Sequence, residues 1–309
     1  MSHTDSQPPP PAKAAAAPSS LPWLEYLDQC IKEEKEDYFG DAPPFEIVRD
    51  LMLAPAEDGN AVTKAVQRFH ESHLERFSGE RFRIPKPPEY GTGHYLNSFA
   101  MTVFETAHYL LFTDPKHDRL ADFLIAIKES AAPQFDPEDP KFIYTGWGLE
   151  AAAAESWNGC QTRATTKDGE NYTVTQQANR WLSVAALIAK LFKGGLLDKD
   201  GPLWTAGDLK DALETSIKGD IATNTGRQAQ ILAAANHILI AGEELAREVK
   251  TPSRKWVFEL SREKWRSWAD KLKEKADAAP EDAPWELKRR TRAAYDKMVE
   301  LLPDAFETT

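Results

Sequence analysis

Cysteine and long apolar runs are scarce in this 309-residue sequence. Its 2 cysteines, Cys30 and Cys160, can form at most one disulfide, whereas small secreted scaffolds are dense in cysteine. The most apolar stretch, residues 181–192, has the length of a core helix and falls short of the ~20 residues that a membrane span needs. We therefore expect a cytoplasmic protein that does not enter a membrane.

An excess of positive charge is also missing, because 38 lysines and arginines stand against 49 aspartates and glutamates, for a formal net charge of −11. Nucleic-acid binding relies on clustered cations that neutralise phosphates, so nucleic acid is not an expected ligand. Residues 1–20 are rich in Pro, Ala and Ser and lack large apolar side chains beyond Met1, so we expect a disordered tail there. The remaining residues, 21–305, are expected to form a helical domain.

The common catalytic and metal-binding signatures are absent as well. The sequence has no Walker loop, no Gly-x-Ser-x-Gly elbow and no kinase motif. His70 and His73 lie three residues apart but lack the His-Glu-x-x-His order of zinc proteases, so they fit a solvated helix face better than a metal site. We expect neither a metal nor a cofactor.

Helical periodicity, by contrast, is present along most of the chain. Residues 181–192 form a nearly all-round apolar pattern that ends at Gly194-Gly195, where glycine favours a left-handed helix end. Residues 228–249 place apolar side chains at steps of three and four. Runs of alternating apolar and polar residues, which would indicate strands, are not found. The pattern predicts an all-α protein of nine or ten helices.

One central segment, residues 132–171, lacks such a pattern and is long for a connection. It fits a lid, a partly helical insert or a disordered loop. Before it, Asp114-Pro115 predicts a helix start, because Asp caps a helix and Pro favours its first position. The segment would join two halves, 21–131 and 172–305, of one large domain.

A few residues are candidates for function. His108 lies on a predicted apolar helix, where a neutral imidazole acts either as a general base or as a hydrogen-bonded core residue. Tyr144, Trp147 and Trp157 fall in the central segment, where they either line a pocket for a flat apolar ligand or anchor the segment to the body. Cys160 has no local signature of a cysteine hydrolase around it, so we assign it no nucleophilic role.

Several runs of residues resemble a known family. Residues 114–128, 179–191 and 233–242 are similar in order and spacing to segments of a fungal family called domain of unknown function 3632. The resemblance implies a helical domain in a family whose members are often encoded near secondary-metabolite genes and share no catalytic residues that can be carried over. Where that family usually has Trp, this chain has His237, which puts an ionisable group into a predicted helix interface.

Two functions follow as hypotheses. The first is a binding or interaction protein, which holds an apolar small molecule against Tyr144, Trp147 and Trp157 or docks a partner protein. The second is a cofactor-independent isomerase, cyclase or dehydratase of fungal secondary metabolism, with His108 or His237 as acid/base. Enzymes of that kind work by enclosing and orienting a substrate and need no recognisable motif. The oligomeric state is left open.

Overall fold

A computed structural model describes residues 21–38, 40–78, 91–129, 148–161, 172–197, 203–215, 219–251 and 260–307. Over these residues the chain forms eleven α-helices and no strand, so the all-α prediction is confirmed. The helices are α1 (Pro22–Glu36), α2 (Pro43–Leu53), α3 (Ala61–Ser78), α4 (Gly91–Ala107), α5 (Pro115–Glu129), α6 (Leu149–Gln161), α7 (Val174–Lys193), α8 (Leu203–Leu213), α9 (Thr225–Lys250), α10 (Arg262–Ala278) and α11 (Leu287–Leu301). Short 3₁₀ turns at Pro284–Glu286 and Pro303–Ala305 flank α11.

The helix beyond the expected nine or ten is α6, which lies within the central segment 132–171. Of the three alternatives for that segment, the partly helical insert is observed over Leu149–Gln161. Its other parts that carry Tyr144 and Trp147, and the expected tail over residues 1–20, lie outside the described residues.

The predicted end signals place two helices correctly. The helix α5 starts at Pro115, and the Asp114 carboxylate accepts a hydrogen bond from the backbone N–H of Lys116 at 2.8 Å. The helix α7 ends at Lys193, directly before Gly194, and Gly195 takes the left-handed conformation with φ of 73°.

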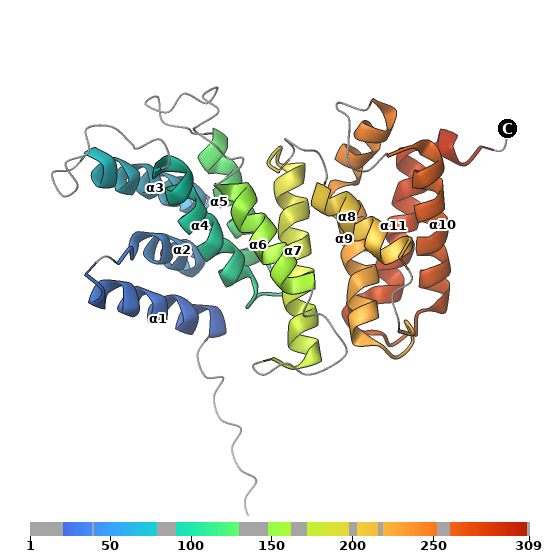
Figure 1. Cartoon of the computed structure of the whole chain (residues 1–309), viewed down its shortest axis with the longest axis horizontal. Helices are drawn as coiled ribbons and strands as arrows, with labels where there is room; N and C mark the ends of the chain where they lie inside the picture. Colours follow the sequence, from blue (N-terminus) through green and yellow to red (C-terminus); the bar gives the residue numbers. More distant parts are fainter. Residues whose placement is uncertain are drawn as a thin grey trace, which may run out of the picture.

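Helix α7 lies in the middle of the molecule and packs against α4, α5 and α6 on one side and against α8 and α9 on the other (Figure 1). Most of its residues are buried, as the apolar pattern of residues 181–192 predicted. The buried apolar side chains of the described residues form one continuous cluster from Trp23 in α1 to Ala305 near the end of the chain. The core therefore runs through α7 without a break.

The other helices bury one stripe and expose the rest. In α1 the buried side chains are Trp23, Leu27 and Ile31, at steps of four, and the remaining positions are largely polar.

Among the described helices, none combines the length and the apolar character that crossing a membrane requires.

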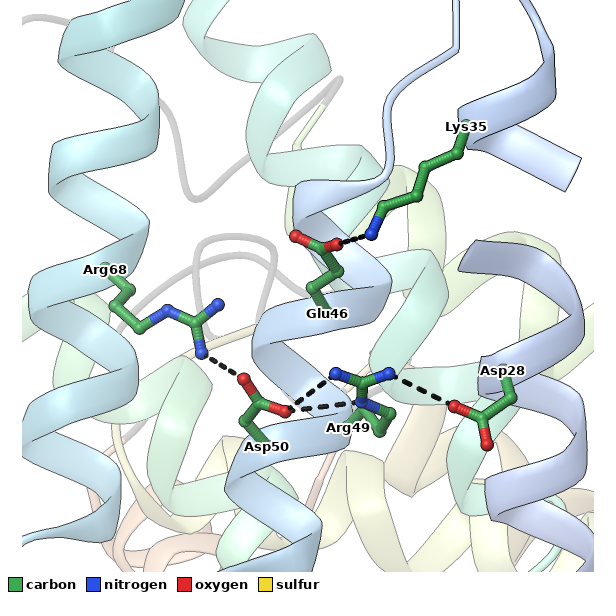
Figure 2. Close-up of polar contacts among 6 residues, drawn as sticks. All are labelled: Asp28, Lys35, Glu46, Arg49, Asp50 and Arg68. Carbon is green, nitrogen blue, oxygen red and sulfur yellow. Dashed lines mark hydrogen bonds and ion pairs between the residues drawn. The ribbon is translucent and has the colours of Figure 1, made fainter. Parts of the chain in front are cut away.

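The first three helices are joined at their surface by ion pairs (Figure 2). Asp50 of α2 accepts hydrogen bonds from Arg68 of α3 at 2.6 Å and from Arg49 at 3.2 Å. Arg49 also contacts Asp28 of α1 at 3.2 Å. A chain of alternating charges thus runs from α1 across α2 to α3.

Candidate functional site

His108 is held where the end of α4 meets α7. The helix α4 ends at Ala107, and Ser183 of α7 donates a hydrogen bond from its hydroxyl to the Ala107 carbonyl at 2.6 Å. The same carbonyl also accepts a hydrogen bond from the backbone N–H of Leu110 at 3.0 Å. The Ser183 bond ties the residue that follows, His108, to α7. The His108 side chain is only 3% exposed.

Both ring nitrogens of His108 have polar neighbours. Nδ1 lies 2.8 Å from Nη2 of Arg180 and 3.1 Å from Oε2 of Glu105, while Nε2 lies 3.7 Å from Sγ of Cys160. A neutral imidazole carries one hydrogen, so these neighbours select its tautomer. If Arg180 donates to Nδ1, the hydrogen is on Nε2 and points at the sulfur. If Nδ1–H donates to Glu105 instead, Nε2 can accept the thiol proton.

Cys160 sits near the end of α6, in the helical part of the central segment. It is buried, with 7% of its surface exposed. The buried positions of α6 are Leu149, Ala152, Ala153, Ser156 and Cys160. They recur at steps of three and four, so they form one face of the helix, and this face packs on α4 and α7.

A cavity of about 160 Å³ opens between α4, α6 and the start of α7. Its lining residues are Met101, Glu105 and His108 from the α4 side, Glu155, Ser156, Gly159 and Cys160 from α6, and Tyr172, Gln177 and Arg180 from the α7 side. Apolar and polar groups both contribute. A cavity of this size suits a small molecule rather than a peptide or a large ring system.

Two buried polar atoms of this lining have no hydrogen-bond partner within the part of the chain that the structure describes. They are the Ser156 hydroxyl oxygen and Oε1 of Gln177. Both residues are more than nine-tenths buried. An unsatisfied buried polar atom costs about 1–3 kcal/mol, so such atoms call for a partner. Both atoms lie in the cavity wall, where a polar molecule or water can bond to them.

Burial and the negative charge of Glu105 both shift the pKa values of nearby side chains. Burial raises the pKa of Tyr26, of Cys30 and of Tyr109, and the negative charge of Glu105 adds to each of these shifts. These groups therefore remain protonated near neutral pH. Beside them, the Arg180 guanidinium stacks on the Tyr172 ring, 4.3 Å from its centroid.

His237 has a different environment. It is fully buried on α9, and its Nε2 lies 2.8 Å from Oδ2 of Asp208 on α8. The second oxygen of Asp208 accepts a hydrogen bond from the indole N–H of Trp157 at 2.9 Å. The three side chains link α6, α8 and α9 within the core. None of them lines the cavity beside His108.

The prediction of a solvated helix face for His70 and His73 fails at His73. His73 is 1% exposed and packs against the Tyr95 ring at 5.2 Å, so the expected solvated face is wrong for this residue because α3 turns it toward α4. Within the described ranges, no group of three or more His, Cys, Asp and Glu side chains is arranged to hold a metal ion.

Sequence reasoning missed most of the cavity wall. The missed residues include Glu105, Ser156, Gln177 and Arg180. Glu105 lies one helical turn from the predicted His108, Ser156 one turn from Cys160, and Gln177 one turn from Arg180. This spacing was visible in the sequence. The meeting of the three helix faces was not, because it depends on how α4, α6 and α7 pack.

The fold and the site define an all-helical protein with a small, partly polar cavity between three helices. The chain belongs to the family described as "Protein of unknown function (DUF3632)", whose model matches residues 100–272 and so confirms the resemblance in the sequence. The matched range begins within α4 and ends within α10, and it includes every residue that lines the cavity. No curated protein and no solved structure matches the chain.

Proposed function

We propose that this protein binds a small polar molecule in the cavity beside His108 and converts it by acid–base chemistry without a cofactor. The observation that carries the proposal is the imidazole in the cavity wall, with Arg180 and Glu105 at one nitrogen and Cys160 at the other. A general base must lie within hydrogen-bond reach of the proton that it takes, and its ring must be oriented by a second contact. His108 lies in the cavity wall, and its contacts with Arg180 and Glu105 orient the ring.

The second histidine candidate, His237, is less suited to this role. Its Nε2 is taken by Asp208 and its side chain is fully buried. A substrate would have to displace the contacts between α8 and α9 to reach it. The proposal therefore rests on His108, and the reactions that fit are the proton transfers of an isomerase, cyclase or dehydratase.

The test is a metabolite comparison in the producing organism. A strain without the gene is complemented with the unchanged protein, with His108→Gln or with His70→Gln, and extracts are compared by mass spectrometry. His70, on α3, is absent from the described cavity wall and serves as the matched control. We expect His108→Gln to reproduce the metabolite change of the deletion, whereas His70→Gln restores the normal pattern. Normal metabolites with His108→Gln at normal protein abundance would contradict the proposal.

A binding role without chemistry is the second proposal. It is favoured by the two unpartnered polar atoms of the cavity wall, Ser156 Oγ and Gln177 Oε1, which need a ligand but not a reaction. In that case a molecule that co-purifies with the protein is recovered unchanged after incubation. Ser156→Ala with Gln177→Leu would abolish its binding in a calorimetric titration, while His108→Gln would only weaken it.

An apolar ligand held by Tyr144, Trp147 and Trp157 is a separate proposal. The described part of this group is Trp157, whose indole N–H is bonded to Asp208. Quenching of tryptophan fluorescence by an apolar ligand, lost in Trp147→Phe but kept in Trp265→Phe, would support it.

A further inference from the structure

We propose that Cys160 is a nucleophile, that His108 activates it, and that its substrates are small acyl compounds with an anionic group. This inference rests on the proposed use of the cavity and goes beyond acid–base chemistry to a covalent step. Three observations carry it. The sulfur lies 3.7 Å from Nε2 of His108, Cys160 is part of the cavity wall, and two polar atoms of that wall lack partners among the described residues.

His108 can take the thiol proton in one tautomer only, but it can stabilise a thiolate in both. With the hydrogen on Nε2, the ring donates to the sulfur anion. With the hydrogen on Nδ1 and bonded to Glu105, the ring takes the thiol proton, and a thiolate beside an imidazolium results. Because Cys160 lies near the C-terminal end of α6, the helix dipole gives the thiolate no help, so His108 and the nearby Arg180 must supply it.

The unpartnered atoms fit the ends of an acyl substrate. Ser156 precedes Cys160 by four residues on the same helix face, so its hydroxyl can donate to the oxygen of a carbonyl that the sulfur attacks. Oε1 of Gln177 accepts a hydrogen bond, so it suits an N–H or O–H of the substrate. Arg180 suits a carboxylate of the substrate. Glu155 and Glu105 also face the cavity, so they limit the negative charge that the cavity can accept.

The covalent step balances with water as the only co-reactant. The thiol proton passes to Nε2 of His108 as the sulfur bonds to the acyl carbon and the carbonyl electrons move to oxygen. When the carbonyl re-forms, the ester C–O bond breaks, and the leaving oxygen takes the proton from Nε2. Water then attacks the thioester and gives its proton to Nε2, the C–S bond breaks, and the proton returns to the sulfur. An acid, an alcohol and the free thiol result.

Cys30 is an internal control for this reactivity. It lies on α1, outside the cavity wall, and burial raises the pKa of its thiol. In one protein, therefore, Cys160 is expected to react as a thiolate at neutral pH, while Cys30 is expected to react only at higher pH.

The experiment measures the alkylation of each cysteine in the full chain by iodoacetamide between pH 6 and pH 9, with peptide mass spectrometry. We expect Cys160 to react at least about tenfold faster than Cys30 at pH 7. His108→Gln should remove this difference, and circular dichroism checks that the variant is folded. A rate for Cys160 equal to or below that of Cys30 in the unchanged protein would overturn the proposal, even if every variant failed to fold.

Two further measurements identify the substrate class. Iodoacetate carries the negative charge that iodoacetamide lacks. Arg180→Gln should therefore slow the reaction of Cys160 with iodoacetate more than its reaction with iodoacetamide, and lower the ratio of the first rate to the second by about threefold or more. With p-nitrophenyl acetate, we expect a rapid release of one nitrophenolate per chain and an acetyl group on Cys160, both lost in Cys160→Ser. Reactive Cys160 without an acetyl adduct would contradict the acyl chemistry.

The outcomes separate this inference from the proposed function. If His108→Gln changes the metabolites of the complemented strain but Cys160→Ser does not, the acid–base role stands and the nucleophile is wrong. If Cys160 is reactive in the purified protein while neither variant changes any metabolite, the proposed function is wrong.

Discussion

Three buried histidines show how neighbours decide the role of one residue type. His108 faces a cavity, and its Nδ1 contacts both the Glu105 carboxylate and the Arg180 guanidinium. His117 accepts a hydrogen bond from Lys190 at Nδ1, so its Nε2–H donates to the Ser183 carbonyl at 3.0 Å. His237 is bonded to Asp208. Of these three residues, His108 is the one that lines the cavity between α4, α6 and α7.

His117 should make the protein sensitive to acid. Burial and the positive charge of Lys190 lower its pKa from 6.5 to about 3. The unfolded chain then binds a proton below pH 6.5 that the folded chain does not, so stability present above that pH is lost as pH falls toward 3. Urea unfolding at several pH values checks this.

A matched variant isolates the contribution of this residue. His117→Gln removes the titrating group, while its amide can still accept from Lys190 and donate to Ser183. We expect a flatter decline of the unfolding free energy between about pH 6.5 and pH 4 than in the unchanged protein. An equally steep decline in both proteins would show that other groups cause the acid sensitivity.

Asp208 should be one of the most sensitive polar positions. Its side chain is 1% exposed and accepts from Trp157 with one oxygen and contacts His237 with the other. Asp208→Ala removes the partner of the buried His237 and of the partly buried Trp157 indole N–H, and we expect a loss of about 3 kcal/mol in unfolding free energy. Asp270→Ala, at an exposed site of α10, should change it by less than about 0.5 kcal/mol. Similar losses for both variants would contradict the importance of the contact.

Among the helices, α1, α2 and α3 combine buried contacts with the surface ion pairs of Figure 2. The two kinds of contact differ in energy. In α2 the side chains of Ile47, Val48 and Leu51 are buried in the core, whereas the charges at Asp28 and Asp50 are about half exposed. Exposed ion pairs are screened by water and salt, so the apolar stripe accounts for most of the docking energy.

Asp50→Ala is expected to lower the unfolding free energy by less than about 1 kcal/mol, although it removes contacts with both Arg49 and Arg68. The loss should shrink further at ~1 M salt, where charges are screened within about 3 Å. A cycle of Asp50→Ala, Arg68→Ala and the double variant measures the interaction between the two side chains. A coupling of several kcal/mol, unchanged by salt, would show that these pairs hold the helices together.

Across the whole molecule, one core joins the helices on both sides of α7. We expect the two halves, 21–131 and 172–305, to pack as one domain through this core. A continuous core favours cooperative unfolding, because the loss of α7 exposes the apolar faces of both groups of helices.

Leu187→Ala tests this cooperativity. Leu187 of α7 is fully buried, and the variant should lose about 3 kcal/mol. Hydrogen exchange should then accelerate in α2 and in α9 alike, whereas Leu53→Ala, at a half-exposed site, should change neither. Faster exchange in only one group of helices would show that the two groups unfold independently.

Much of the fold followed from local patterns. The apolar period of residues 181–192, the Asp114-Pro115 start and the glycines after Lys193 depend on interactions within one turn of helix, so they can be read directly. The helix α6 was missed because its buried face consists of small residues, Ala152, Ala153 and Ser156 among them, which give a weak apolar signal. Trp157 lies on the same helix, partly buried against the core, and its indole N–H is bonded to Asp208.

The amino-acid sequence sufficed for the helical class, most helix positions, the family and the choice of His108 as a candidate, because each depends on residue types and their spacing along the chain. The packing of α4, α6 and α7 settles what His108 can do. It brings Cys160 and Arg180, which are far from His108 in the sequence, to the imidazole that Glu105 already contacts from one helical turn away. Contacts of that kind depend on how helix faces meet in space, and the period of a single helix does not contain that information.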